Sequence, residues 1–85
     1  MSKDEKIAIV KTMNAESIQD LLHSLGFGEE VNQAFLSVGG AFLHSLFSSD
    51  DIEIKEELAR RKLSGFIIKD LYARLKPIVV GEGNL

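Results

Sequence analysis

The chain has 85 residues, of which 45% are hydrophobic, and a formal net charge of −3. This length accommodates one hydrophobic core, and the apolar fraction is typical of a folded domain and too high for a disordered chain. The small net charge does not favour a protein whose whole surface binds nucleic acid or an anionic membrane. The sequence has no cysteine, which excludes disulfides, thiolate zinc sites and cysteine nucleophiles.

Residues 1–13 allow two interpretations. Ser2 and Glu5 have the spacing of a capping box, which begins a helix, but the apolar run at 7–10 would also suit a short strand. We therefore expect either a short helix or an extended arm laid against the core. The acidic start does not resemble a signal peptide, and no apolar run is long enough to span a membrane. We expect a cytoplasmic or nuclear domain.

Two helices are predicted in the first half of the chain. Asn14 is a good N-cap, the aliphatic residues between 18 and 25 recur on one helical face, and Gly26 is placed to end that helix. Glu29 begins the next helix, and Gly39-Gly40 is predicted to stop it. Its apolar positions are Val31, Ala34, Phe35 and Val38.

A short helical element and a fourth helix follow. The element covers residues 41–46, with Phe42, Leu43 and Leu46 expected to point inward. Ser48 has capping-box spacing with Asp51 and is predicted to start the next helix. Its apolar face is expected to include Ile52 and Leu58, with Ile54 off that face.

The longest helix is predicted over residues 64–76. Ser64 is its expected N-cap, Lys and Arg gather near its end, and Pro77 is expected to prevent clean continuation. Its apolar face consists of Ile67, Ile68, Leu71, Tyr72 and Leu75.

The predicted fold is therefore all-α. Residues 14–77 form a compact five-helix bundle with a long C-terminal helix, residues 1–13 precede it as an arm or short helix, and residues 78–85 form a C-terminal tail.

No catalytic, metal or cofactor site is predicted. His23 and His44 lack further ligands, and the acids after Asp50 lack the alternating oxygen ligands and central glycine of a calcium loop. No serine lies in a nucleophile motif, and the glycine pairs fit helix ends better than a phosphate loop. We expect a protein that is not an enzyme and that takes no cofactor or small-molecule substrate.

A basic cluster before and within the last helix has two interpretations. Its residues, Arg60, Arg61, Lys62 and Lys69, lie near a helix start, where the helix dipole does not favour cations. Such an arrangement can mark a surface kept for an acidic protein or a phosphate backbone, or it can be an ordinary solvated link. Phe66, next to the expected core residue Ile67, either packs in the core or is partly exposed.

Several motifs between residues 18 and 75 resemble those of a sterile alpha motif (SAM) domain. They are Leu25-Gly26-Phe27 after the first helix, the spacing from Val38 to Leu46, the acidic Asp50-Asp51-Ile52, and Gly65 at the start of the last helix. The chain departs from the SAM pattern in four places. The link from Phe35 to Val38 is two residues shorter than usual, Gly39 replaces an aspartate, Phe66-Ile67 replaces a histidine-arginine pair, and the first helix has no tryptophan.

The resemblance implies a five-helix module that binds proteins, either itself or another helical domain. SAM domains associate through an acidic mid-loop face and a basic face at the start of the last helix, and contact between different faces can produce open polymers. Here the acidic face would comprise Asp50, Asp51 and Glu53, and the basic face Arg60, Arg61, Lys62, Ser64, Phe66 and Lys69.

Two alternatives stay open. A minority of SAM domains bind RNA hairpins through the same helix start, although the negative net charge argues against that function here. A death-fold adaptor is also possible, and it would require six antiparallel helices and hence a true N-terminal helix. No membrane partner is expected.

Overall fold

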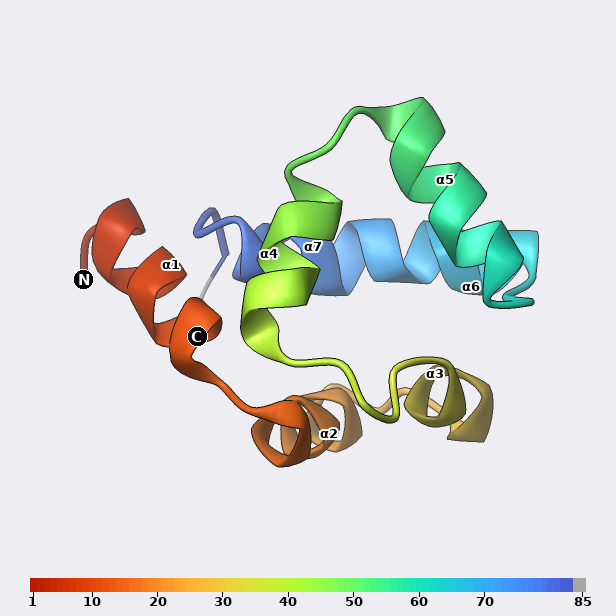
Figure 1. Cartoon of the computed structure of the whole chain (residues 1–85), viewed down its shortest axis with the longest axis horizontal. Helices are drawn as coiled ribbons and strands as arrows, with labels where there is room; N and C mark the ends of the chain where they lie inside the picture. Colours follow the sequence, from red (N-terminus) through yellow and green to blue (C-terminus); the bar gives the residue numbers. More distant parts are fainter. Residues whose placement is uncertain (84–85) are drawn as a thin grey trace.

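Residues 1–83 are described by a computed structural model, shown in Figure 1. This part of the chain is helical and contains no strand, which confirms the predicted all-α bundle. Its radius of gyration of 11.8 Å matches the value of about 12 Å expected of a compact globule of this length. The elements are α1 (Lys3–Thr12), α2 (Ala15–Ser24), α3 (Glu29–Ala34), α4 (Gly40–Phe47), α5 (Asp51–Arg60), α6 (Gly65–Asp70), the π-helical turn η1 (Leu71–Leu75) and α7 (Lys76–Val79).

The N-terminal segment is a helix and not an extended arm. Ser2 Oγ accepts a hydrogen bond from the Glu5 backbone N–H at 3.2 Å, and the Glu5 carboxylate accepts one from the Ser2 N–H at 3.3 Å. This capping box satisfies backbone donors that a helix start leaves free. α1 packs against α4 and α7 and buries Val10 completely, so this helix is part of the bundle.

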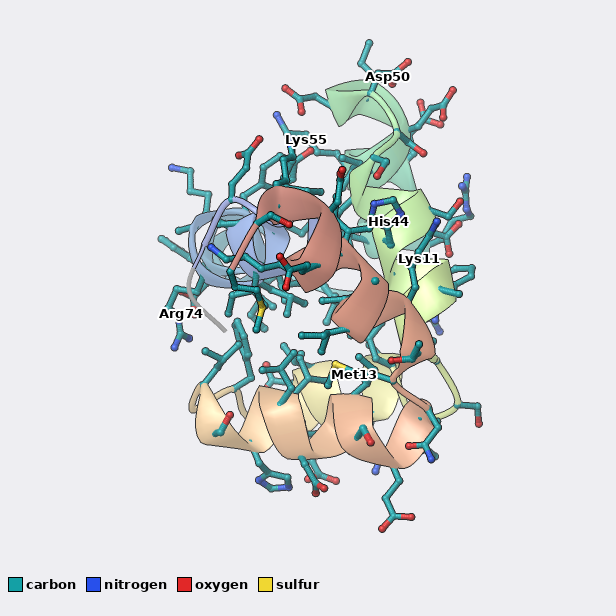
Figure 2. All side chains as sticks on the ribbon, turned by 90° about the vertical axis from the view of Figure 1, so that its left-hand side faces the viewer. Lys11, Met13, His44, Asp50, Lys55 and Arg74 are labelled. Atoms are coloured by element: carbon teal, nitrogen blue, oxygen red, sulfur yellow. The ribbon has the colours of Figure 1, made fainter. Side chains whose placement is uncertain are left out.

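α1 and α4 meet at Gly40. The Gly40 N–H donates to the Met13 carbonyl oxygen at 2.8 Å, and a Cβ atom at position 40 would lie 1.7 Å from the Val10 carbonyl oxygen. Only glycine allows the two backbones to approach this closely. Figure 2 shows Met13 directed between α1 and α2. The prediction that Gly39-Gly40 ends the preceding helix is wrong, because α3 ends at Ala34 and the two glycines begin α4.

α2 has the predicted cap and the predicted end. The Asn14 side chain accepts from the Ser17 N–H at 2.8 Å, and Gly26 has a φ of 82° just after the helix. That left-handed conformation is common after a helix and suits glycine best. Phe27 then turns into the core, where its ring lies 4.3 Å from the Arg74 guanidinium. Arg74 also donates to the Leu25 carbonyl, which ties the last helix to the end of α2.

The N-cap and the inward face of α5 differ from the prediction. Asp50, and not Ser48, caps the helix by accepting from the Glu53 N–H at 2.9 Å. Ile54 is fully buried and Ile52 is 70% exposed, which is the reverse of the expected arrangement. Ile54 and Leu58 are four positions apart and so share a helical face, whereas Ile52 and Leu58 are six apart and do not.

α4 also departs from prediction at one residue. Leu43 and Leu46 are buried as expected, but Phe42 is 44% exposed. The buried row on α4 continues through Phe47, and residues 43, 46 and 47 share one face by helical spacing. Phe42 lies beside that face, on the side toward α5.

The C-terminal helix continues past Pro77, which corrects the predicted end at Lys76. Within η1 the hydrogen-bond register widens, and the Lys76 N–H donates to the Leu71 carbonyl, five residues back. Pro77 then occupies the first turn of α7, where a helix does not require its missing N–H. Ile78 and Val79 are buried, so the first residues of the predicted tail belong to the core.

The two ends of the described chain lie together. Lys6 Nζ donates to the Gly83 carbonyl oxygen at 3.0 Å, and Lys3 Nζ lies 3.8 Å from a carboxylate oxygen of Glu82. Figure 1 places this pair of ends beside α1, at the opposite side of the molecule from the start of α6. None of the helices in residues 1–83 combines the length and the apolar character that crossing a bilayer requires.

Replacing Gly40 with alanine is expected to lower the free energy of unfolding by about 2–3 kcal/mol, because the new Cβ would force α1 away from α4. Urea unfolding followed by circular dichroism measures the change. Gly65→Ala is a matched control, since Gly65 is likewise the first residue of a helix and a Cβ there would meet nothing within 4 Å. Equal stability of the two variants would contradict the close contact.

Candidate functional site

The predicted acidic face is partly engaged within the chain. Asp50 caps α5, and Figure 2 shows it at the outer tip of the bundle. Asp51 accepts from the Tyr72 hydroxyl at 3.3 Å and lies 3.7 Å from Lys76 Nζ. Glu53 is exposed and forms no ion pair among residues 1–83. Of these three acids, Glu53 is therefore the one most available to a partner.

Tyr72 joins the start of α5 to the C-terminal helix. Two ammonium groups lie close to its ring, with Lys55 Nζ 5.8 Å and Lys76 Nζ 4.9 Å from the ring centre. Partial burial, followed by the negative charge and hydrogen bond of Asp51, raises the pKa of the Tyr72 hydroxyl. The tyrosine remains a neutral donor at physiological pH, so this cluster holds two helices together.

Arg61, predicted on the basic face, is largely engaged inside the molecule. Its Nη1 donates to the Ala34 carbonyl oxygen at 2.8 Å, and its Nε donates to Glu57 at 3.0 Å. The guanidinium also lies over the rings of Phe35 and Phe42, at 5.5 and 5.1 Å. Arg61 thus links the ends of α3 and α5 to α4, and it has little freedom to bind a partner.

Glu57 neutralises much of the predicted basic cluster. One carboxylate oxygen accepts from Arg60 Nη2 at 3.1 Å, and the other accepts from Arg61 Nε at 3.0 Å. The hydrogen bond from Arg60, together with its charge and that of Arg61, outweighs partial burial and lowers the pKa of the Glu57 carboxyl. Two of the four predicted cations therefore already have an anionic neighbour.

The turn between α5 and α6 holds two more predicted residues. Lys62 is exposed and has a φ of 64°, the left-handed conformation that ends a helix. Ser64 Oγ accepts from the Ile67 N–H at 3.4 Å and so serves as the N-cap of α6. Ser64 thus has a structural role, whereas the charge of Lys62 has no ion-pair partner within residues 1–83.

Phe66 is the most exposed large hydrophobic residue in the described chain, at 87%. An open hollow beside it is lined by Gly65, Phe66 and Lys69, and we call these three residues the Phe66 surface. Lys69 is exposed and, within residues 1–83, forms no ion pair. The alternative that Phe66 packs in the core is therefore wrong. The structure instead presents an aromatic ring and a free ammonium together at the start of a long helix.

A groove of about 280 Å³ is lined by residues of α4 and α5; in Figure 1, α4 crosses the middle of the molecule and α5 lies above and to the right of it. Apolar atoms of Phe42 and Leu46 contribute to its lining, and Glu53 and Glu56 are exposed along α5 without ion-pair partners among residues 1–83. We call it the α4–α5 groove; its lining residues are Phe42, Ser45, Leu46, Ser49, Glu53, Glu56, Glu57 and Arg60.

Sequence reasoning identified Glu53 and Arg60 but missed the rest of this groove. A sequence signal existed at Phe42, because a phenylalanine one place before Leu43 falls beside the buried row of α4 and not within it. The other positions could not be grouped from the sequence, since the packing angle between α4 and α5 decides which residues face each other.

The described residues contain no group of three histidine, cysteine or acidic side chains placed to hold a metal ion. Comparisons with protein-family models, curated proteins and solved structures found no match for this chain. The resemblance to SAM domains therefore depends on the sequence motifs alone. What the geometry offers chemically is two surfaces of opposite charge, each with an exposed aromatic ring.

Replacing Glu57 with glutamine is expected to lower the free energy of unfolding at pH 7 by up to about 1 kcal/mol. The ion pairs stabilise the fold fully above the ordinary glutamate pKa of 4.5, and this contribution is lost as the pH falls through the lower folded-state value. The difference between wild type and variant should therefore disappear in acid. Urea unfolding at several pH values tests this.

The matched control is Glu56→Gln, one position along the same helix. Glu56 is exposed and, unlike Glu57, forms no ion pair within residues 1–83. Its replacement should leave stability at pH 7 nearly unchanged. An effect as large as that of Glu57→Gln would show that general charge, and not the arginine pairs, explains the loss.

Proposed function

We propose that this chain is a protein-interaction module, and not an enzyme, that binds itself or another helical domain. The observation that carries the proposal is the position of Phe66, exposed beside Lys69 at the start of the C-terminal helix. Burying a phenylalanine side chain is worth about 1.5–3 kcal/mol. Aromatic residues such as phenylalanine are enriched at protein contact sites relative to the rest of the surface.

We propose that the α4–α5 groove is the acidic surface through which this chain binds a partner. It retains Glu53 from the acidic face expected from sequence and adds Glu56, while Asp50 and Asp51 have roles within the fold. A groove lined by both apolar and acidic side chains suits an aromatic or aliphatic side chain that is accompanied by a cation. The module thus has a surface of each charge.

The order of elements supports the SAM-like interpretation. After α1, the described chain has four helices followed by one long C-terminal helix, the number and order that a SAM domain requires. α1 is an addition to that pattern. A death-fold adaptor is the alternative interpretation, because α1 supplies the true N-terminal helix that it needs. Both interpretations lead to the same class of function, which is binding between helical domains.

Nucleic-acid binding is the weaker candidate. Arg61 is engaged with Ala34 and Glu57, and Arg60 also pairs with Glu57. Lys62 and Lys69 remain, and two cations provide little of the phosphate neutralisation on which such binding depends. We place the module in the cytoplasm or nucleus, which agrees with the absence of cysteine in the sequence.

A photo-crosslinking amino acid tests the proposal directly. Benzoylphenylalanine would be incorporated at position 66, and the protein would be illuminated both as a concentrated purified sample and in cell extract. We expect position 66 to form crosslinks to protein. The same residue at position 52 is a matched control, because Ile52 is also an exposed apolar residue, at 70%. Equal crosslinking at both positions, no protein adduct, or adducts with nucleic acid only would overturn the proposal.

A further inference from the structure

We propose that Ser64 is phosphorylated by a serine kinase that selects basic residues before its target, and that the phosphate weakens partner binding at the Phe66 surface. This inference rests on the proposed function and adds its regulation. Ser64 directly precedes Gly65, the first residue of that surface. A phosphate on Ser64 therefore acts at the contact itself.

The residues before Ser64 provide the recognition signal. Arg60, Arg61 and Lys62 stand four, three and two positions before it. No other serine or threonine in the sequence has more than one lysine or arginine among its four preceding residues. Kinases distinguish their substrates by charge patterns of this kind, because acidic side chains beside the catalytic site attract cations and repel acids. The sequence thus singles out Ser64 as the acceptor.

Ser64 is accessible in the folded protein. It is exposed in the turn between α5 and α6, which Figure 1 places at the right-hand end of the molecule, across from the termini. Its backbone is extended, with φ −72° and ψ 163°, as in peptides that lie along a binding cleft. Ser64 Oγ accepts from the Ile67 N–H at 3.4 Å, and its own O–H donates to no group within residues 1–83.

A kinase must draw this turn away from the rest of the protein. The contacts that oppose the movement belong to Leu63, which is 7% exposed, and to Arg61, which donates to Ala34 and Glu57. Lys62 favours the movement, because its φ of 64° is a strained conformation for a residue with a side chain. Segments of this size open without unfolding the whole domain. Ser64 can therefore reach a kinase from the folded state.

The reaction is a phosphoryl transfer from magnesium-bound ATP. Ser64 Oγ forms a bond to the γ-phosphorus, the bond from that phosphorus to the β–γ bridging oxygen breaks, and ADP leaves. The hydroxyl proton passes to the catalytic aspartate of the kinase. Oxygens of the new phosphate can accept from the Ile67 N–H in place of the free hydroxyl, so α6 keeps its cap.

The phosphate reverses the charge balance of the Phe66 surface. It carries a charge of about −2, whereas Lys62 and Lys69 are two cations without ion-pair partners in the described chain. Lys69 is five positions after Ser64, an axial rise of about 7.5 Å, which is within the Debye length of about 8 Å at physiological salt. The phosphate therefore offsets both lysines and repels an acidic partner.

The modification is tested on the full chain with magnesium, ATP and the catalytic subunit of cyclic AMP-dependent protein kinase, and mass spectrometry locates the phosphate. We expect one phosphate, on Ser64. Replacing both Arg60 and Lys62 with alanine should slow its addition about tenfold or more. The matched control, Lys11→Ala with Lys69→Ala, removes the same charge elsewhere and should react like wild type. No phosphate on Ser64, or equal rates for the two double variants, would overturn the inference.

All four of the replaced side chains are exposed, so both double variants should keep the wild-type circular dichroism spectrum and urea midpoint. If either of these changes, the comparison of Lys62→Ala with Lys69→Ala decides in the same way, because neither lysine forms an ion pair within residues 1–83.

Crosslinking from position 66 tests the effect on binding. Protein that carries benzoylphenylalanine there and phosphate on Ser64 should form about tenfold fewer protein crosslinks than the same protein without phosphate. Ser64→Asn, treated with the same kinase, is the control. Asparagine also caps a helix but takes no phosphate, so its crosslinking should not change.

The outcomes separate this inference from the proposed function. Crosslinking that the phosphate leaves unchanged or increases would overturn the inference, while the proposed function would stand. Without any protein crosslink from unphosphorylated protein, the proposed function fails, and the switch that acts on it fails with it.

Discussion

The bundle depends on one row of apolar side chains along the C-terminal helix. Leu71, Leu75 and Val79 are all fully buried, and the helix that carries them runs through the middle of the molecule in Figure 1. Phe66 is five positions before Leu71, so it lies about 140° around the helix from the buried row. Burial of this row therefore directs Phe66 outward. The exposed ring is a consequence of how the core closes.

The C-terminal helix also shows how a helix can continue through a proline. Proline normally ends or kinks a helix because it lacks an N–H and clashes with the preceding turn. Here the wide turn of η1 shifts the hydrogen-bond register before Pro77, and the chain continues helically to Val79. Because the helix continues, Ile78 and Val79 are buried in the core. A chain that left the helix at Lys76 would place these two side chains elsewhere.

Much of the fold could be predicted from the sequence because its determinants are local. The caps at Asn14 and Ser64 and the left-handed Gly26 depend on neighbouring residues only. The error at Ile54 arose from grouping Ile52 with Leu58, which lie six positions apart and so on different faces. The error at Gly40 arose where contacts between helices decide the outcome. Gly40 resembles a helix stop in the sequence, but its role is to admit the backbone of α1.

The residues of the candidate site likewise fall into two groups, those that local sequence predicts and those whose role depends on packing between helices. Phe66 and Lys69 could be identified because they follow a clear helix start. The engagement of Arg61 could not be foreseen, since its partners Ala34 and Phe42 are distant in sequence and meet it only through packing. A cluster of cations in a sequence therefore overstates the charge that a folded chain leaves free.

The pairing of Lys6 with Gly83 has a practical consequence for engineering. Because the start of α1 and the residues from Val80 to Gly83 meet at one corner, a fluorescent protein or an immobilisation tag joined before α1 or directly after Gly83 would project from that corner, across the molecule from α6. A short peptide bridging the corner would be a natural place to close the chain for circular permutation. New ends could then be opened in a surface turn without disturbing the helices that frame the groove.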